Sequence, residues 1–194
     1  MAVSYSPGGD DACDRIVPDG VVVRDLALHA DERGSLTEIF RQSWHEAFRP
    51  LQWNASRSEA RVLRGVHVHR LHTDYLVVLA GAMLLALHDI RPSSPTRGRS
   101  VLLPLDGKAP KAVVIPPGVA HGFYFAEPSM YLCGVDEYWD GSDEIGCRFD
   151  SPELDLRWPN LAPTLSARDN LAGSYAEMVR QFFEPGEAPV KGRE

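Results

Sequence analysis

The sequence predicts an all-β domain with short helices only at its flanks. Two observations support this fold class: the apolar runs are short and β-rich, with turn residues between them, and long helical periodicities are scarce. Many short strands in one chain of 194 residues favour a sandwich or a small barrel, and a jelly roll is the leading candidate.

The expected strands follow one another between turn residues. Residues 20–28 form the first, residues 75–90 form two strands that meet near Ala80–Gly81, residues 112–125 form a strand, a Pro-Gly turn and a strand, and residues 130–139 form another. Pro removes a ladder donor and Gly permits positive φ, so both residues mark the junctions. Weaker helical patterns cover residues 41–48 and 171–183.

The composition predicts one domain at residues 21–183, between a flexible leader (1–20) and a flexible tail (184–194). The 20 basic and 27 acidic residues give a net charge of −7, which argues against nucleic acid as a partner. The longest apolar run, residues 75–87, is too short for a membrane-spanning helix. The first 20 residues lack a secretory signal, and three cysteines without CxxC spacing suit a cytoplasmic protein.

Histidines gather in two segments of the chain. RGVHVHRLHTD contains His67 and His69, and PPGVAHGF contains His121. Side chains alternate along a strand, so His67 and His69 are expected on one face. The Pro-Gly turn before His121 is expected to direct its imidazole from a neighbouring strand. The three imidazoles therefore indicate a functional site inside the domain.

These segments resemble the two motifs of the cupins. Residues 67–81 read H-x-H-x4-D-x6-G and residues 116–121 read P-x-G-x2-H, with Asp74 where metal-binding cupins usually carry glutamate. The resemblance implies a double-stranded β-helix, the cupin jelly roll. It also leaves open a divalent metal held by His67, His69, Asp74 and His121, although aspartate is shorter than glutamate by about 1.5 Å.

Six segments in order resemble one cupin family, the dTDP-4-dehydrorhamnose 3,5-epimerases. They are DERGSLTEIF (31–40), LQWNASRS (51–58), VLRGVH (62–67), HDIRPSSPTRG (88–98), IPPGVAHGF (115–123), and LRWP with LSARD (156–169). The resemblance implies a homodimeric, cofactor-independent isomerase. Its substrate would be a nucleotide-linked 4-keto-6-deoxyhexose, from which it removes a proton next to the ketone.

The resemblance also implies roles for individual residues. His67 matches the catalytic base, Asp169 the aspartate paired with it, and His121 the second active-site histidine. A carboxylate next to an imidazole fixes its tautomer and stabilises the imidazolium. The positions matching substrate-binding residues are Arg33 and Arg64 at the diphosphate, and Glu38, Gln52 and Asn54 near the nucleotide and sugar.

Three positions depart from the epimerase pattern. Asp74 stands where the family has a lysine that stabilises the enolate, and an anion there has the opposite effect. Cys133 falls at the position of the tyrosine that reprotonates the sugar, with Tyr131 two residues earlier on the same strand face. His69 replaces a glutamine, and H-x-H before a basic residue is similar to the dTDP-sugar 3,4-ketoisomerases.

Three functions follow from these patterns. The first is epimerisation or isomerisation of a nucleotide-linked keto sugar at one or both carbons beside the ketone. The second is a metal-dependent oxygenase or lyase that uses the histidine and Asp74 set. The third is binding of a sugar nucleotide without catalysis.

Overall fold

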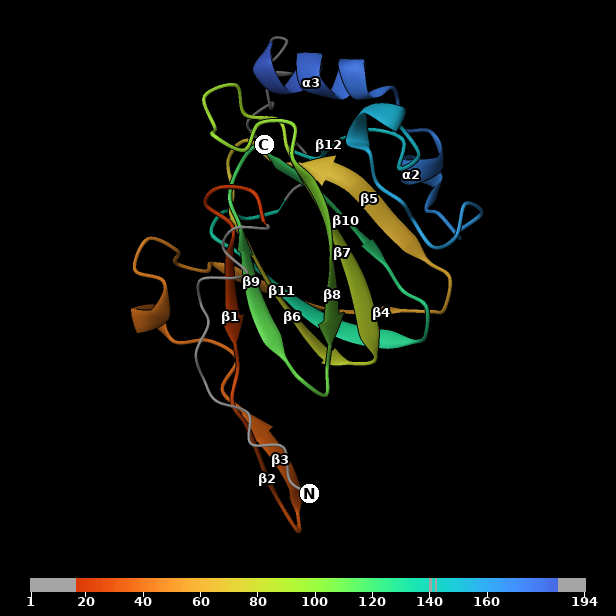
Figure 1. The fold of residues 1–194 in the computed structure, drawn as a ribbon. Helices are drawn as coiled ribbons and strands as arrows, with labels where there is room; N and C mark the ends of the chain where they lie inside the picture. The colour runs from red at the N-terminus through yellow and green to blue at the C-terminus, as the bar shows by residue number, and fades with distance from the viewer. Residues whose placement is uncertain (1–16, 140, 142, 185–194) are drawn as a thin grey trace, which may run out of the picture.

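The computed structural model describes residues 17–139, 141 and 143–184 and shows two facing antiparallel sheets with a projecting hairpin (Figure 1). The all-β jelly-roll prediction is confirmed. Residues 1–16 of the expected leader and residues 185–194 of the expected tail lie outside the described residues. Val17 already packs in the core, with 2% of its surface exposed.

Each of the two main sheets has five strands. The first contains, in spatial order, β1 (Val22–Asp25), β9 (Lys111–Ile115), β6 (Asp74–Ala80), β11 (Ser129–Val135) and β4 (Gln52–Ser58). The second contains β12 (Ile145–Gly146), β5 (Leu63–Val68), β10 (Val119–Tyr124), β7 (Ala82–Asp89) and β8 (Ser100–Asp106). From β4 to β11 most connections cross from one sheet to the other, which places segments distant in sequence face to face.

Strand alternation produces three apolar layers. Along β6, Leu76 and Val78 point between the sheets, whereas Tyr75 and Val77 point to the outer face of the first sheet. A third cluster covers the outer face of the second sheet and includes Met178. The cluster that contains Leu76 and Val78 therefore fills the interior of the barrel, and the other two clusters cover the outer faces of the two sheets.

The C-terminal helices confirm one of the two helical predictions. The structure has α2 (Ala167–Asn170) and α3 (Tyr175–Phe183), and two 3-10 turns, η1 (Gln42–Trp44) and η2 (Pro152–Leu154). Ser174 begins α3 with a capping box, in which its hydroxyl accepts from the Glu177 backbone and the Glu177 carboxylate accepts from the Ser174 backbone. The pattern at 41–48 yields only η1.

Gly65 allows the central strands of the second sheet to approach closely. Its φ is +111°, and a Cβ atom there would lie 2.8 Å from both the Gly122 Cα and the His121 carbonyl oxygen. Only glycine fits such a position without a shift of the backbone. The resulting register places His67 on β5 directly opposite His121 on β10.

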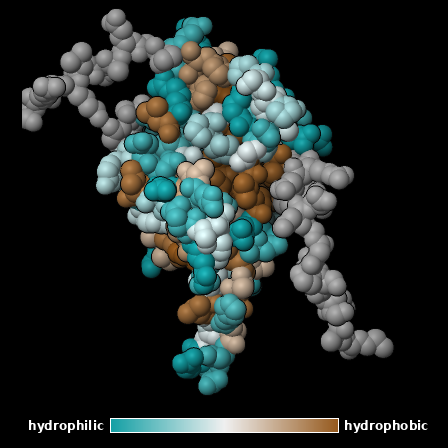
Figure 2. Space-filling view, turned by 90° about the vertical axis from the view of Figure 1, so that its left-hand side faces the viewer, coloured by the Kyte–Doolittle hydropathy of each residue, from teal (hydrophilic) through white to brown (hydrophobic). Residues whose placement is uncertain are grey.

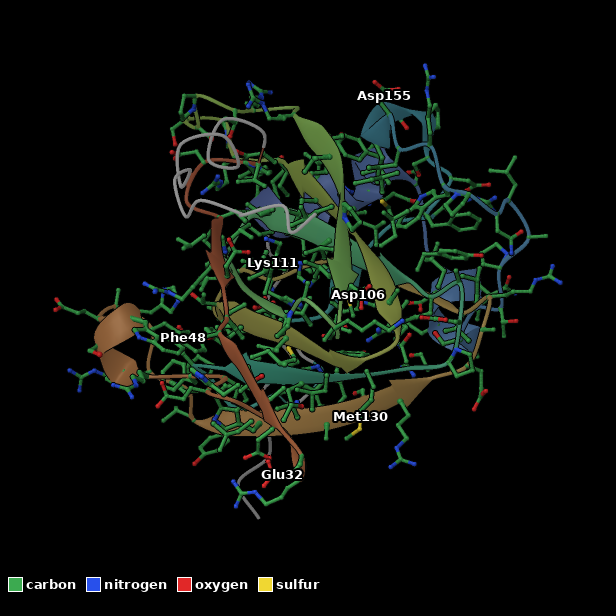
Figure 3. All side chains as sticks on the ribbon, turned by 60° about the horizontal axis from the view of Figure 1, so that its bottom comes forward. Glu32, Phe48, Asp106, Lys111, Met130 and Asp155 are labelled. Carbon is green, nitrogen blue, oxygen red and sulfur yellow. The ribbon has the colours of Figure 1, made fainter. Side chains whose placement is uncertain are left out.

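The hairpin of β2 (Leu28–Asp31) and β3 (Gly34–Thr37) extends away from the sheets (Figure 1). Figure 2 shows it standing out from the body of the molecule, with apolar and hydrophilic surface intermixed. In Figure 3, Glu32 in the hairpin turn and Asp155 before the C-terminal helices lie at opposite ends of the view. Among the described residues, no helix is long and apolar enough to cross a membrane.

Candidate active site

A cavity of about 490 Å³ opens between the two sheets, a size suited to a small-molecule ligand. Most of its lining residues are polar, and they include His67, His69 and His121 from the predicted motifs. The lining residues are Asn54, Ala55, Ser56, Arg64, His67, His69, His72, Asp74, His121, Phe123, Tyr131, Cys133, Val135, Trp139, Glu144 and Arg168.

The two sheets supply the histidines as strand alternation predicts. His67 lies on β5 and His69 follows directly after the strand, and both line the cavity. The intervening Val68 packs on the outer face of the same sheet. His121 reaches the cavity from β10, after the predicted Pro-Gly turn. All three imidazoles therefore line the same cavity.

His67, which is half-buried, forms a hydrogen-bonded pair with the buried Asp169. His67 Nε2 lies 2.7 Å from Asp169 Oδ1, and the Gly65 backbone N–H donates to Oδ2 at 3.3 Å. Burial alone would raise the pKa of Asp169, but the hydrogen bonds from His67, Ser166 and Gly65 lower that pKa to about 2. An ionised carboxylate only accepts hydrogen bonds, so Nε2 carries the proton. Nδ1 of His67 is left with the lone pair that a general base needs.

Glu144 and Arg168 flank this pair and were missed by the sequence reasoning. Arg168 donates to Glu144 Oε2, and its Nη2 lies 2.9 Å from His67 Nε2. Trp139 Nε1–H donates to Glu144 Oε1 at 2.8 Å. Burial on its own raises the pKa of Glu144, but His67, His69 and the other partners bring it below its ordinary value. The position of Arg168 next to Asp169 in LSARD was the one available signal.

Asp74 lies among three imidazoles. Its carboxylate is 3.7 Å from His69 Nε2, 3.8 Å from His72 Nε2 and 3.6 Å from His121 Nε2. Burial raises the pKa of Asp74 to about 6 and lowers the pKa of each of the three imidazoles. His72 was not identified from the sequence, although it stands only two positions before Asp74.

The structure brings together three of the four residues named for a possible metal, and it adds His72. His69, His72 and Asp74 form a compact group of potential ligands, and His121 adjoins it through Asp74. His67 is instead held by Asp169.

Both candidate proton donors point into the cavity from β11. Tyr131 and Cys133 share a strand face, as their spacing predicts, and both line the cavity. Burial raises the pKa of the Tyr131 phenol and raises that of the Cys133 thiol well above its ordinary value. The thiol donates to Asp74 Oδ1 at 3.3 Å. Both groups therefore keep their protons at neutral pH.

The predicted substrate-binding residues divide into two sets. Asn54 and Arg64 line the cavity, and Gln52 supports it by donating to Asn54 Oδ1 and accepting from the Trp139 backbone. Arg33 pairs with Asp31 at the end of the projecting hairpin. Glu38 pairs with Arg41 on the surface after that hairpin. The fold of one chain does not bring Arg33 and Glu38 to the cavity.

Comparison with known proteins shows that the chain is similar to nucleotide-sugar epimerases. The dTDP-4-dehydrorhamnose 3,5-epimerase of Mycobacterium tuberculosis is 33% identical over 165 residues, which cover 78% of this chain and 81% of that protein. The dTDP-4-dehydro-6-deoxyglucose 3-epimerase of Streptomyces bikiniensis is 30% identical over 179 residues, or 86% of this chain and 90% of that protein.

Solved structures agree with these sequence relatives. The 3′-monoepimerase ChmJ of Streptomyces bikiniensis in complex with dTDP-quinovose superposes with a TM-score of 0.76 at 28% identity, covering 82% of this chain and 85% of that one. RmlC of Legionella pneumophila with dTDP-4-keto-L-rhamnose has a TM-score of 0.75 at 30% identity, covering 84% and 95%. The family pattern itself matches residues 17–177, and the chain therefore belongs to the dTDP-4-dehydrorhamnose 3,5-epimerase family.

Proposed function

We propose that the protein epimerises a nucleotide-linked 4-keto-6-deoxyhexose, with dTDP as the nucleotide. The observation that carries the proposal is the His67–Asp169 pair, in which His67 lines the cavity and its Nδ1, 3.4 Å from Arg168 Nη2, holds the lone pair that accepts a proton. Relatives with the same fold act on such sugars at one or at two carbons. The proton next to the ketone is acidic because its loss gives an enolate.

The proposed reaction has two proton transfers. His67 Nδ1 takes the proton from the carbon beside the ketone, and the C–H electrons form the enolate with its charge on the ketone oxygen. A donor on the other side of the sugar then returns a proton to that carbon and inverts it. Tyr131 and Cys133 are the candidate donors, because both keep their protons and face the cavity. His121 and His69 complete the wall near the sugar.

We propose inversion at one carbon rather than two. Asp74 stands where the resembled epimerases have lysine, and Cys133 stands at the position of their tyrosine. Each inversion needs an efficient proton donor on the far side of the sugar, so two successive inversions need one twice. A site with these replacements is suited to the single exchange that the 3-epimerase relatives are named for.

The positions of the predicted nucleotide-binding residues support a homodimer. Arg64 is placed to contact the diphosphate from within the cavity, whereas Arg33 and Glu38 are exposed on and after the hairpin. These two residues can serve the roles implied for them only if a second copy of the chain presents its hairpin to this cavity. The free thiols of Cys133 and Cys147 are consistent with a cytoplasmic location.

The test is deuterium exchange from solvent into the sugar. The protein is incubated in D₂O with dTDP-4-keto-6-deoxyglucose, and NMR follows the C3 and C5 protons. We expect exchange and inversion at one carbon, and His67→Asn should slow exchange by about 10² to 10⁴-fold, as for loss of a general base. The variant should still bind dTDP, which serves as the control for folding.

Full exchange by His67→Asn would remove this histidine from the reaction. Binding of dTDP by the wild type without any exchange would instead identify a sugar-nucleotide binding protein.

A further inference from the structure

A second group of cavity side chains takes no part in the proton transfer assigned to His67. His69, His72 and Asp74 each offer one ligand atom, and these atoms all lie within 4.8 Å of one another. His121 presents a further imidazole nitrogen 3.6 Å from Asp74 Oδ2. All four residues are buried, with 4–6% of their surface exposed. Asp74 Oδ1 also accepts from the Cys133 thiol at 3.3 Å, and three imidazoles surround this one buried carboxylate.

Hydrogen bonds fix the tautomers of two of these imidazoles. His69 Nδ1 lies 3.0 Å from the Asp143 carbonyl oxygen, and His121 Nδ1 lies 3.1 Å from the Val119 carbonyl oxygen. A carbonyl oxygen only accepts, so both Nδ1 atoms donate and both Nε2 atoms present lone pairs toward Asp74. Histidines that bind metal almost always donate their other ring N–H in this way.

The distances from the Asp74 carboxylate to the imidazole nitrogens are close to those between ligands around an ion. Asp74 Oδ2 is 3.7 Å from His69 Nε2, and Asp74 Oδ1 is 3.8 Å from His72 Nε2. These distances exceed the range of about 2.7–3.2 Å for an N–H···O hydrogen bond. Two ligands at about 2.1 Å from a tetrahedral ion lie about 3.4 Å apart, close to what is seen. Lone pairs and a carboxylate that converge this way are stabilised by a cation between them.

Neighbouring residues hold the group in place. Asp143 accepts backbone N–H groups of Arg70 and Leu71 on its carboxylate, and this fixes the loop that carries His72. The His69 and His72 rings stack with their centroids 3.9 Å apart. The ligand atoms therefore come from the residue after β5, from a braced loop, and from β6 and β10 in the two facing sheets, which is a preorganised arrangement.

We propose that His69, His72 and Asp74, with His121 as the fourth ligand, bind one divalent transition-metal ion. Three imidazoles and one carboxylate suit Zn²⁺, Fe²⁺, Co²⁺ or Mn²⁺. The ion supplies positive charge at the position where the resembled epimerases carry a lysine, and this charge favours an enolate oxygen. That last consequence rests on the proposed function, whereas the binding of the metal does not.

The test uses the full chain after removal of metal with a chelator. Titration with Co²⁺ is followed by visible absorption, which reports nitrogen ligation, and by calorimetry. We expect one ion per chain, and we expect His72→Gln and Asp74→Asn each to weaken binding by at least about 100-fold. His67→Asn is the matched control, because this histidine lies in the same cavity but is held by Asp169, and it should bind Co²⁺ as the wild type does.

Circular dichroism and thermal unfolding establish that each variant folds, and His72→Gln carries the test if Asp74→Asn does not. The proposal is overturned if the wild type shows no saturable Co²⁺ binding, if His72→Gln binds as tightly as the wild type, or if His67→Asn loses as much affinity as His72→Gln. Failure of the proposed function is distinguishable, since it would appear as Co²⁺ binding without deuterium exchange into the sugar.

Discussion

At the scale of single residues, Asp169 determines which nitrogen of His67 can act as a base. The carboxylate is nearly buried, stays ionised through its hydrogen bonds and accepts from Nε2 at 2.7 Å. A neutral amide in its place could present either an N–H or an oxygen to the ring. The tautomer of His67 would then no longer be fixed, and the charge that stabilises the imidazolium would be lost.

We therefore expect Asp169→Asn to slow deuterium exchange at the sugar carbon by about 10² to 10⁴-fold. The affinity for dTDP should change little, because Asp169 lies behind His67 rather than at the cavity wall. Single-turnover exchange and calorimetry with dTDP measure the two effects separately. An equal loss of exchange and of dTDP affinity would indicate that Asp169 acts only on the structure.

Arg64 is the arginine of this chain best placed for the diphosphate. Its Nε donates to Ser58 Oγ at 2.9 Å and its Nη2 to the Arg57 carbonyl at 3.1 Å, so the guanidinium is oriented before a ligand binds. Arg64→Ala should weaken dTDP binding by about 1.5–3 kcal/mol, the value for a hydrogen bond to a charged group. Calorimetry measures this, with Arg57→Ala on β4 as the control, since Arg64 bonds to the backbone carbonyl of Arg57. Unchanged affinity in Arg64→Ala would exclude the assigned role.

At the scale of elements, one buried carboxylate organises the connection between β7 and β8. Asp89 is fully buried and accepts from Arg91 Nε at 2.9 Å, Arg91 Nη2 at 2.8 Å and Thr96 Oγ1 at 2.6 Å. Burial alone would raise the pKa of Asp89, but these bonds and that from Ser94 hold the pKa far below its ordinary range. The segment HDIRPSSPTRG is thus a folded turn around a charge.

Asp89→Asn should lower the free energy of unfolding by about 3 kcal/mol, because it leaves the buried part of Arg91 without its counter-charge. Urea unfolding at neutral pH measures this loss. Asp150→Asn is the control, since Asp150 pairs with Arg148 at the surface and its replacement should have a much smaller effect.

The wild type and Asp89→Asn should also differ in how their free energy of unfolding depends on pH, and the sign of this difference can be derived. A carboxylate whose folded pKa is lowered stabilises the fold above its unfolded pKa of about 3.9, and this contribution is lost as the pH falls toward the folded pKa. The difference in unfolding free energy between wild type and Asp89→Asn should therefore be constant above about pH 5 and shrink below about pH 4. A difference that grows on acidification would contradict this account of Asp89.

The elements that the sequence predicted well are those with a strong local pattern. The pair of strands on either side of Gly81 and the helix at 175–183 follow from apolar spacing and, between the strands, from a turn glycine. The helix expected at 41–48 is shortened because the Gln42 side chain donates to the His45 and Phe48 carbonyls and closes a compact turn. Phe48 then packs on Tyr75, outside the first sheet (Figure 3).

At the scale of the whole molecule, the sequence predicted those site residues that lie in recognisable motifs. It did not predict the residues that only the folding of the chain brings to the cavity. His67 and Asp169 are 102 positions apart, yet both lie in recognisable segments. Glu144 belongs to no such segment and reaches the cavity through its contacts with Trp139 and Arg168. His72 is close in sequence to His69, but period-two alternation does not place it on the cavity side, because it lies in a loop after the strand.

The projecting hairpin provides the last prediction, on the assembly of the molecule. Leu28 and Leu36 on its two strands expose 42% and 63% of their surface, and such apolar surface outside the body is suited to a second copy of the chain. Leu36→Asp places a charge there and should shift the protein from dimer toward monomer in light scattering, with weaker dTDP binding because the neighbour's Arg33 is withdrawn. Leu161→Asp, at a leucine that is also exposed (79%) but lies far from the hairpin in sequence, is the control and should remain dimeric. A wild type that is monomeric at the concentrations used for turnover, or a Leu36→Asp protein that stays dimeric, would show that the hairpin does not join two chains.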